Sequence, residues 1–312
     1  MRPRARIATL RILHVNEYPA AVGGAEKMLL DTCELQQIRG HLVGMLYADY
    51  VPPVAHPFPS FRLPRSSGFR DARDLSPVVQ RVLDEFRPDV VHLHNTLNFL
   101  SPFVVPRFAE RVPTVKYVHD ARLVCPRHQT KILARSGSAC RYAMGPRCAV
   151  HCFPIEFSPG LSLSLRQAAL RLMELRVVRN LASTMVGSRY MFDELCRNGF
   201  ARDRLDIVPG FTDKRLVATA PAESNEILAV GRFDGVKGLE DFVGVLARLA
   251  FPHWTATLVG EGWRLPESRR LAERLGIADR VRFTGRLPPA ELDRHYERAA
   301  LVVVPSRVPE AF

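Results

Sequence analysis

Two cations and three glycines are clustered in the stretch LAVGRFDGVKGLED, residues 228–241. Arg232 and Lys237 lie between an apolar run, 227–230, that predicts a buried strand and a helix predicted from the apolar spacing over 239–249. A glycine turn before a helix directs backbone N–H groups at one point, and two cations add positive charge there. This combination suits a phosphate or diphosphate group, with a strand-to-helix turn carrying two solvated cations as the alternative.

Two further glycine pairs follow predicted strands. Gly23 and Gly24 separate the first strand from its helix, so a ligand could approach the backbone and the helix N-terminus closely. A tight loop without a ligand is the alternative. The GEG sequence at 260–262 is a GxG, but Leu265 stands where a dinucleotide-binding fingerprint needs its third glycine. We therefore expect no nicotinamide cofactor, and the chain also lacks the P-loop motif of nucleotidases.

Three histidines belong to two neighbouring predicted strands. His119 follows the strand 114–118, and ligands of open parallel sheets bind beyond the carboxyl ends of the strands. We therefore predict that His119 donates a hydrogen bond to a hydroxyl or phosphate group, with a structural histidine as the alternative. His92 and His94 are expected to point to opposite faces of the strand 89–94. They are interpreted as packing and loop contacts rather than as a metal pair.

Four cysteines and two histidines fall within the segment 121–159, which is polar and too poor in apolar residues to form a core of its own. Four thiolates could hold a structural zinc ion or an iron–sulfur cluster, although the spacing is not the paired C-x-x-C of a zinc ribbon. Free thiols or a disulfide are the alternatives. Cys33 and Cys196 are expected to be small buried residues of helices. The candidate metal ligands are Cys125, Cys140, Cys148 and Cys152.

The bulk composition is that of a globular protein large enough for two domains, with 312 residues, 47% of them hydrophobic and 24% charged. The net charge of +12 is scattered and mostly arginine, which favours anionic partners or reflects a GC-rich genome. No apolar run approaches the roughly 18 residues of a membrane span, and the N-terminus lacks a signal-peptide cleavage site. We expect a cytoplasmic protein without a nucleic-acid partner. The basic helix over 161–181 suggests peripheral contact with an anionic membrane, or a half-buried helix with a solvated face.

Strand and helix signals alternate along the chain, which predicts parallel sheets covered on both faces. Residues 48–76 are interpreted as a long loop, and the polar residues 210–225 as a domain boundary. The predicted domains are therefore 1–210 and 211–312. The predicted strands are 10–15, 42–47, 89–94, 114–118, 184–186, 205–208, 227–230, 255–259, 281–283 and 301–304. The predicted helices are 25–37, 77–86, 99–110, 161–181, 189–198, 239–249, 266–275 and 289–299.

Taken together, these segments resemble glycosyltransferase family 4, a large family of retaining enzymes. The resemblance implies an α/β protein of the GT-B class, with two Rossmann-like domains facing across a cleft. It covers nearly the whole chain, and it rests on the order and spacing of the motifs because each one alone is weak. They are GGAE (23–26), PDVVHLHN (88–95), HD (119–120), VGSRY (186–190), IVPGF (207–211), VGRFDGVKG (230–238), LVGEG (258–262), VRFTGRLP (281–288) and PSRVPEAF (305–312).

The resemblance implies an acceptor-side first domain, a nucleotide-sugar-binding second domain and roles for individual residues. Arg232 and Lys237 would hold the diphosphate of the donor and stabilise the charge that builds there as the glycosidic bond breaks. His119 would contact the transferred sugar, and Glu310 would be the first glutamate of the E-x7-E motif that contacts the same sugar. No metal ion or other cofactor is required for this chemistry. The remaining donor-site residues would be Gly23, Gly24 and Glu261.

The resemblance also implies a departure at the C-terminus. The second glutamate of the motif, which would bind the ribose, should stand eight residues after Glu310, beyond Phe312. We therefore expect an incomplete second domain, weak donor binding and slow turnover. The implied function is sugar transfer to a polysaccharide, lipid-linked or small-molecule acceptor in cell-envelope polysaccharide biosynthesis. The alternatives are an impaired fragment or pseudoenzyme that only binds, and a nucleotide-sugar epimerase, which the GRFDGVKG and EAF motifs disfavour.

Overall fold

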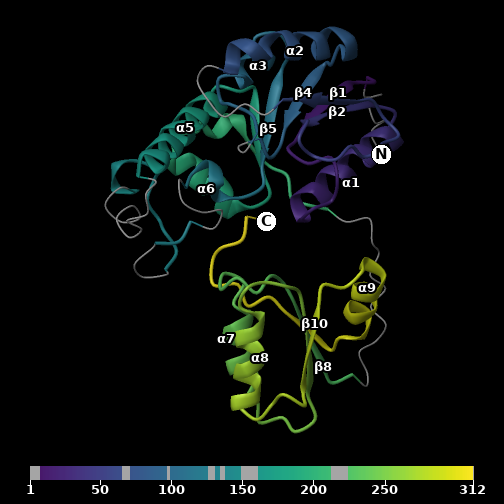
Figure 1. Ribbon diagram of the computed structural model, residues 1–312, viewed down its shortest axis with the longest axis vertical. Helices are drawn as coiled ribbons and strands as arrows, with labels where there is room; N and C mark the ends of the chain where they lie inside the picture. Colours follow the sequence, from purple (N-terminus) through teal and green to yellow (C-terminus); the bar gives the residue numbers. More distant parts are fainter. Residues whose placement is uncertain are drawn as a thin grey trace, which may run out of the picture. The chain divides into compact units, whose positions relative to one another are not determined.

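The computed structural model describes two compact units (Figure 1). The first comprises Met1–Thr212 together with Glu310–Phe312, and the second comprises Asp213–Pro309. The described residues are 8–64, 71–96, 99–125, 131–133, 138–148, 161–211 and 224–311, without the side chains of 71–74 and 161–168. Each unit is built around its own parallel sheet and its own hydrophobic core.

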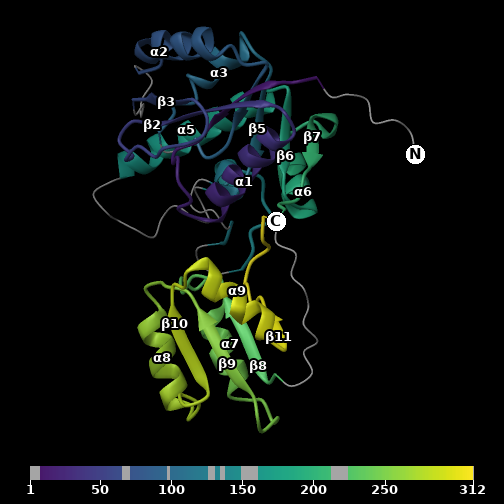
Figure 2. The same ribbon diagram turned by 90° about the vertical axis from the view of Figure 1, so that its right-hand side faces the viewer.

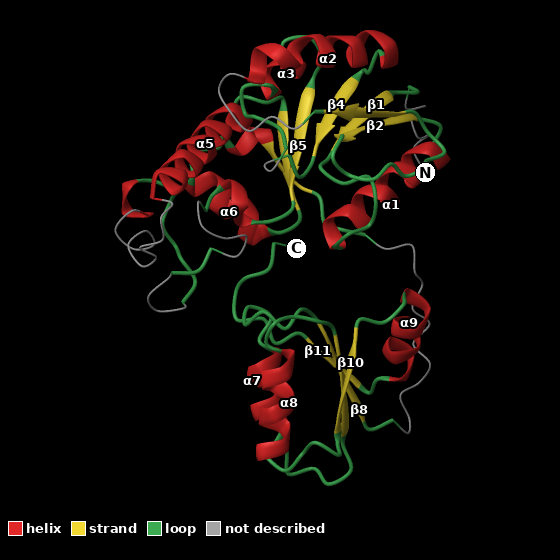
Figure 3. Ribbon diagram, viewed as in Figure 1, coloured by secondary structure: helices red, strands yellow, loops and turns green. Residues whose placement is uncertain are grey.

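The described residues of the first unit form seven parallel strands in the order β3-β2-β1-β4-β5-β6-β7. Figure 3 draws the strands in yellow. Because the order reverses between β1 and β4, their carboxyl ends form a topological switch point, where parallel sheets bind ligands. The strands are β1 (Arg11–Val15), β2 (Leu42–Ala48), β3 (Ser60–Leu63), β4 (Val90–Leu93), β5 (Thr114–Val118), β6 (Ser183–Val186) and β7 (Leu205–Ile207).

Helices cover both faces of this sheet. On one face, Leu29 and Cys33 lie one turn apart on α1 and pack against Met45 of β2. The larger core on the other face joins α2, α3, α5 and α6 to the strands. These helices are α1 (Gly24–Ile38), α2 (Asp71–Phe86), α3 (Val105–Ala109), α5 (Leu161–Arg179) and α6 (Arg189–Arg197), with the short 3₁₀ turns η1 (Ala121–Leu123) and η2 (Arg202–Arg204).

The described residues of the second unit form four parallel strands in the order β10-β9-β8-β11 (Figure 2). The apolar faces of α7 and α8 pack on one side of the sheet, and α9, which has no buried residue, lies on the other. The order reverses between β8 and β11, which creates a second switch point. The elements are β8 (Glu226–Val230), α7 (Leu239–Leu246), β9 (Thr255–Val259), α8 (Leu265–Arg274), β10 (Val281–Gly285), α9 (Pro289–Arg298) and β11 (Leu301–Val303).

The predicted parallel α/β architecture is confirmed, and three local predictions are wrong. The expected loop over 48–76 contains β3, whose sequence SFRL alternates polar and apolar residues over only four positions, too few to stand out in a proline-rich stretch. Helix α2 begins at Asp71 with Pro77 inside it, although proline is more common in the first helical turn. The helix expected over 99–110 is reduced to α3, because turns that bond to the Thr96 carbonyl precede it.

The described part of α5 is half-buried, in line with the second interpretation of this basic helix. Leu175 and Val178 are buried in the core, whereas Arg176 is exposed. None of the helices within the described ranges combines the length and apolar composition needed to cross a membrane.

Candidate functional site

The loops that follow β1 and β4 are bonded to each other at the first switch point. The Asn95 backbone N–H donates to Asn16 Oδ1 at 3.0 Å, and Glu17 N–H donates to the Asn95 carbonyl at 3.0 Å. The Asn95 side chain donates to Glu26 Oε1 at 3.1 Å, and Glu26 lies in the first turn of α1, where the helix dipole favours a carboxylate. These bonds hold both strand ends and the start of α1 in one arrangement.

Gly23 and Gly24 form the N-terminus of α1, and no side chain caps this helix. Gly23 is extended, and a Cβ atom there would lie 3.2 Å from a Glu26 carboxylate oxygen. At Gly24 a Cβ atom would meet nothing within 4 Å. Neither glycine has a positive φ angle, so the backbone conformation does not require them. What they provide is an open helix N-terminus, which is a suitable place for an anion.

Three imidazole rings form a hydrogen-bonded row across β1, β4 and β5. His14 Nδ1 lies 3.0 Å from His94 Nε2, and His94 Nδ1 lies 3.0 Å from His119 Nε2. The expectation that His92 and His94 point to opposite faces is wrong. Their ring centroids are 4.1 Å apart, because side chains two residues apart on a strand share a face. No local pattern singles out His14, which the register pairs with His92.

Burial keeps these rings neutral at pH 7. It lowers the pKa of His14 to about 4 and that of His119 to about 3, and it holds the pKa values of His92 and His94 well below the usual range. Lys116 and Arg122 add positive charge that lowers the pKa of His119 further. Nδ1 of His119 is buried and has no hydrogen-bond partner among the described residues. A neutral ring nitrogen of this kind is free to bond with a ligand group.

Among the described residues, one group has a geometry that could hold a metal ion: His14, His92 and His94. One ligand atom from each of these histidines lies within 4.8 Å of the others. However, the His14 and His94 nitrogens already bond to each other. The ammonium group of Lys116 also lowers the pKa of His92 and His94, so a cation here would be repelled. The geometry is therefore better explained by neutral, hydrogen-bonded rings than by a metal centre.

Among the described residues, Cys33, Cys140 and Cys196 are free thiols. Cys125 is buried, and Cys140 and Cys148 are half-buried; they do not appear together in a group of metal-ligand geometry. Cys152 lies outside the described residues, so a structural zinc ion stays a prediction. Burial raises the pKa of the Cys33 thiol to about 12, as expected for an inert core cysteine, whereas Cys196 is half-buried rather than buried.

The described pieces of the cysteine-containing segment are attached to α6. The ammonium group of Lys131 forms an ion pair with Glu194, and both side chains are buried. The Met144 N–H donates to Asn198 Oδ1, just beyond the end of α6, at 2.8 Å. The segment is thus attached to the first unit by these polar contacts and by apolar residues such as Leu123 and Met144, which join the core of that unit.

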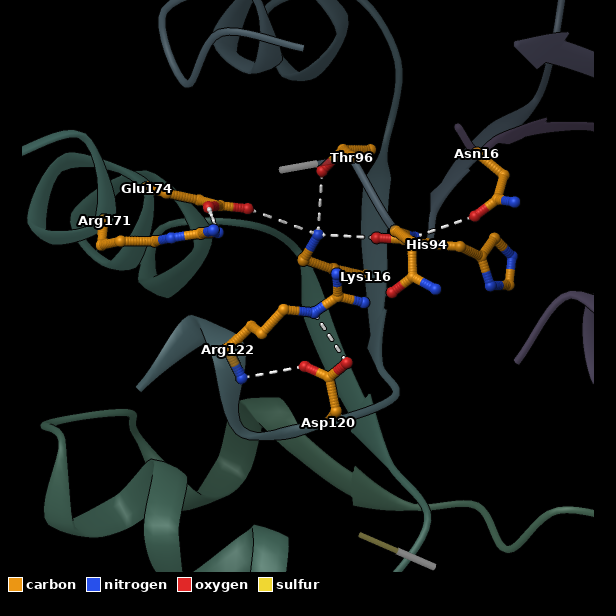
Figure 4. A network of polar contacts seen from close by, with 9 residues as sticks. Asn16, His94, Thr96, Lys116, Asp120, Arg122, Arg171 and Glu174 are labelled. Carbon is orange, nitrogen blue, oxygen red and sulfur yellow. Dashed lines mark hydrogen bonds and ion pairs between the residues drawn. The ribbon is translucent and has the colours of Figure 1, made fainter. Parts of the chain in front are cut away.

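A buried ion pair joins the middle of β5 to α5, next to the end of β4 (Figure 4). Lys116 Nζ donates to the His94 carbonyl at 2.8 Å and to Thr96 Oγ1 at 3.1 Å, and Glu174 Oε1 of α5 is 3.6 Å away. Burial lowers the pKa of Lys116 and raises that of Glu174, while each partner opposes the shift of the other. The sequence analysis missed this pair, although a lone charge within an apolar strand or helix face indicates a buried partner.

Asp120 closes the turn after His119. Its Oδ1 accepts from Arg122 N–H at 2.8 Å and its Oδ2 accepts from Arg122 Nε at 2.8 Å (Figure 4). The carboxylate thus caps η1 and fixes the direction in which the chain leaves β5. Arg122 is part-buried, so its guanidinium group stays next to the end of the strand.

The loop after β8 carries the two cations at the second switch point. Arg232 Nη2 lies 3.0 Å from Asp234 Oδ2, and the arginine side chain is 58% exposed. Asp234 Oδ1 also accepts from the N–H groups of Val236 at 3.0 Å and Lys237 at 3.4 Å. Lys237 is half-buried and directly precedes the Gly238 cap of α7. Both predicted phosphate-binding cations therefore lie on one short loop at the start of a helix.

The GEG sequence supports this loop from the neighbouring strand. A Cβ atom at Gly260 would lie 1.8 Å from the Gly231 carbonyl oxygen, and one at Gly262 would lie 2.3 Å from that of Phe233. Both glycines have positive φ angles. Phe233 N–H donates to the Glu261 carbonyl at 2.9 Å, and the Glu261 side chain is exposed. The two glycines of this GxG allow the loops after β8 and β9 to approach each other closely.

The loop after β11 holds the same segment from the other side. Arg307 forms two hydrogen bonds with the Asp241 carboxylate of α7, and its N–H donates to the Val236 carbonyl at 3.0 Å. Gly238 has a φ of +68°, and a Cβ atom there would lie 2.0 Å from the Pro305 carbonyl oxygen. The sequence analysis missed this pair because the two charges are far apart in the chain.

The predicted site residues fall into two sets. The second unit brings Arg232 and Lys237 together, with Glu261 on the adjoining loop. The first unit carries the two glycines of α1 and His119 around its own switch point. Glu310 is half-buried and is grouped with the first unit.

Comparison with known families gives two matches that together run from residue 22 to the end of the chain. Residues 22–216 match the model described as Glycosyltransferase Family 4, and residues 211–312 match that of Glycosyl transferases group 1. No curated protein matches the chain at a significant level.

Solved structures resemble the chain over most of its length. HepE from Anabaena, in complex with UDP and glucose, has a TM-score of 0.62 at 19% identity, covering 97% of this chain and 76% of its own. Sucrose-phosphate synthase from Thermosynechococcus elongatus has a TM-score of 0.64 at 20% identity, covering 96% and 76%. The lipopolysaccharide outer core galactosyltransferase WaaB has a TM-score of 0.62 at 14% identity, covering 95% and 74%. At these identities the likeness shows the fold, which is the predicted GT-B class.

Proposed function

Because the chain belongs to glycosyltransferase family 4, we propose that it transfers a sugar from a nucleotide-diphosphate-sugar donor to a polysaccharide, lipid-linked or small-molecule acceptor with retention of configuration. The observation that carries this proposal is the loop after β8, where Arg232 and Lys237 lie at a switch point and at the start of α7. Glycosyl transfer itself follows from the family. The donor diphosphate is assigned to this loop because two cations and a helix N-terminus suit two phosphates.

The second unit would act on the leaving group. As the bond between the anomeric carbon and the diphosphate oxygen breaks, negative charge grows on that oxygen, and Arg232 and Lys237 would stabilise it. A new bond forms between the anomeric carbon and the acceptor oxygen. The acceptor's proton passes to the leaving phosphate oxygen on the same face of the sugar, so configuration is retained. This route uses no metal ion and no protein base.

The first unit would position the sugar and the acceptor. The open N-terminus of α1 at Gly23 and Gly24 suits an anionic group, either a donor phosphate or a charged acceptor. His119 would contact the transferred sugar, and Glu310 would bond to the same sugar. The network around Lys116 keeps the end of β5 rigid, which such positioning needs.

The solved neighbours support the choice of substrates by analogy of fold. HepE was solved with UDP and glucose, and WaaB is a lipopolysaccharide galactosyltransferase. We infer a UDP- or GDP-type donor and a role in cell-envelope polysaccharide synthesis on the cytoplasmic side of the membrane. The positive net charge of +12 supports contact with anionic lipid or with a phosphorylated acceptor.

Thermal shift against a panel of UDP- and GDP-sugars tests the donor site. A donor present at 100 times its Kd stabilises the protein by about 2.7 kcal/mol, which gives a clear rise in melting temperature. Arg232→Ala and Lys237→Ala should each weaken donor binding by roughly 10-fold or more, because a charge-assisted hydrogen bond contributes about 1.5–3 kcal/mol.

Arg274→Ala is the matched control, since this exposed arginine ends α8 and carries the same charge. An equal loss of donor binding in all three variants, or no stabilisation by any nucleotide-sugar, would refute the proposed site. Incubation with donor and acceptor separates the alternatives. Transfer supports the enzyme, binding without transfer supports the impaired protein, and an epimerised donor without any acceptor supports an epimerase.

A further inference from the structure

The row of histidines connects α1 with the end of β5. Gln36 Oε1 on α1 lies 2.7 Å from His14 Nε2, and two ring-to-ring hydrogen bonds of 3.0 Å lead from His14 through His94 to His119. A hydrogen bond between two ring nitrogens needs an N–H on one ring and a bare nitrogen on the other. Because a neutral imidazole has one of each, the tautomer of one ring determines the tautomer of the next.

The amide oxygen of Gln36 sets the direction of the row. It accepts, so His14 carries its proton on Nε2 and its Nδ1 is bare. His14 Nδ1 then accepts from Nε2–H of His94, and His94 Nδ1 accepts from Nε2–H of His119. The last ring is left with a bare Nδ1. A hydrogen-bond donor at position 36 would reverse every step and place a proton on Nδ1 of His119.

We propose that Gln36, His14 and His94 are positioning residues that hold His119 as the Nε2–H tautomer, so that its Nδ1 accepts a hydrogen bond from a hydroxyl group of the sugar. That the ligand is a sugar rests on the proposed function, whereas the tautomer of His119 rests on the hydrogen-bonded row alone. The assignment also changes the role expected for His119 from donor to acceptor.

Three observations support this role. Nδ1 of His119 is buried without a partner among the described residues, and native proteins seldom leave such an atom unpaired outside functional sites. Lys116 holds the His94 carbonyl at 2.8 Å and so fixes the middle of the row from the backbone. Its positive charge, together with that of Arg122, opposes a second proton on His119, so the ring stays neutral.

Histidine tautomers are read directly from long-range ¹H–¹⁵N NMR spectra of the ¹⁵N-histidine-labelled full chain at pH 7. The unmodified protein and Gln36→Glu, which can only accept, should both show His119 protonated on Nε2. Gln36→Lys, which can only donate, should move the proton to Nδ1 in all three rings. Gln37→Lys is the matched control, since it adds the same charge one residue along α1 and should change nothing.

Three results would overturn the proposal. They are Nδ1–H on His119 in the unmodified protein, an unchanged spectrum in Gln36→Lys, or a change at His14 that does not reach His119. Residue 36 bonds to the row at His14, two rings from His119, so general loosening of the fold would not produce a tautomer change at His119.

Sugar transfer gives the second readout, with a donor identified in the thermal-shift panel. Gln36→Lys should lower kcat/KM by about 10-fold while free nucleotide diphosphate still binds, whereas Gln36→Glu and Gln37→Lys should stay near the unmodified protein. Normal kcat/KM in Gln36→Lys with a reversed tautomer would overturn the role of Nδ1. Absence of transfer by the unmodified protein would instead refute the proposed function, which the NMR result does not depend on.

Discussion

Single charged residues inside apolar elements organise the first unit at the residue scale. Lys116 is the cation of the strand sequence TVKYV, and Glu174 lies among leucines on α5. Their side chains are only 4% and 5% exposed, and they meet at 3.6 Å. Lys116 also bonds to the backbone that follows β4, so one ammonium group joins β4, β5 and α5. A residue that sequence patterning treats as an exception is therefore central to the arrangement beside His119.

Removing this ammonium group should destabilise the protein strongly. Lys116→Met leaves Glu174 buried without its main partner, and breaking a buried pair in this way costs about 3–5 kcal/mol. The double variant Lys116→Met/Glu174→Leu should recover part of that loss. Urea unfolding at pH 7 measures both.

Lys27→Met is the comparison, because the Lys27 side chain, which pairs with Asp31 on α1, is 57% exposed. It should change the free energy of unfolding by less than about 1 kcal/mol. If Lys27→Met and Lys116→Met lowered the free energy of unfolding by similar amounts, the buried pair would stabilise the protein no more than the exposed lysine does.

At the element scale, close contacts at glycines fix how the loops of the second unit pack against each other. The loops after β8, β9 and β11 approach so closely that side chains at Gly238, Gly260 and Gly262 would overlap with carbonyl oxygens. These contacts present Arg232 and Lys237 from a fixed backbone. A glycine-rich loop is therefore needed here for packing as well as for access by phosphate.

Gly260→Ala should displace the loop that carries Arg232. The new Cβ atom would lie 1.8 Å from the Gly231 carbonyl oxygen at a φ of +141°, so the backbone must move. We expect a loss of at least about 1–3 kcal/mol and loss of the donor-induced thermal shift. Both tryptophans, Trp254 and Trp263, belong to the second unit, so fluorescence during urea unfolding reports on it.

The control for this substitution is Gly244→Ala in the middle of α7. A Cβ atom there meets nothing within 4 Å, so alanine should stabilise the helix by roughly 0.5–1 kcal/mol. If Gly260→Ala behaved like Gly244→Ala, the close approach of the two loops would not matter for stability.

The buried histidines are distributed unevenly at the scale of the whole molecule. His14, His92, His94 and His119 all belong to the first unit and are neutral when it is folded. Below the ordinary histidine pKa of 6.5 the unfolded chain takes up these protons, whereas the folded unit does not. The stability that these rings contribute is therefore present above pH 6.5 and is lost as the pH falls toward 4.

Acid should consequently destabilise the first unit before the second. Each of these histidines contributes up to about 1.4 kcal/mol per pH unit in this window. Melting followed by circular dichroism, to which the larger first unit contributes most, should shift downward between pH 7 and pH 5. Melting followed by tryptophan fluorescence should shift less. Equal shifts by both probes would contradict this account.

Much of the architecture and part of the site were predictable from local sequence. Apolar strands and amphipathic helices repeat with periods that depend on nearest neighbours, so β1, β5, α1 and α7 were placed to within a few residues. The loop with Arg232 and Lys237 was found because its glycines and cations are adjacent in the chain. By contrast, the alternating pattern of β3 spans only four residues, and its pairing with β2 establishes it as a strand.

Sequence by itself determined which elements form and that a cationic glycine loop precedes α7. Only the tertiary structure decided which distant side chains meet. The parallel register aligns His14 with His92, and the row to His119 joins three strands. Asp241 in the first turn of α7 and Arg307 in the loop after β11 come together at one switch point. The physical reason is that strand order and register bring together residues far apart in the chain, whereas a local pattern reports only on residues a few positions away.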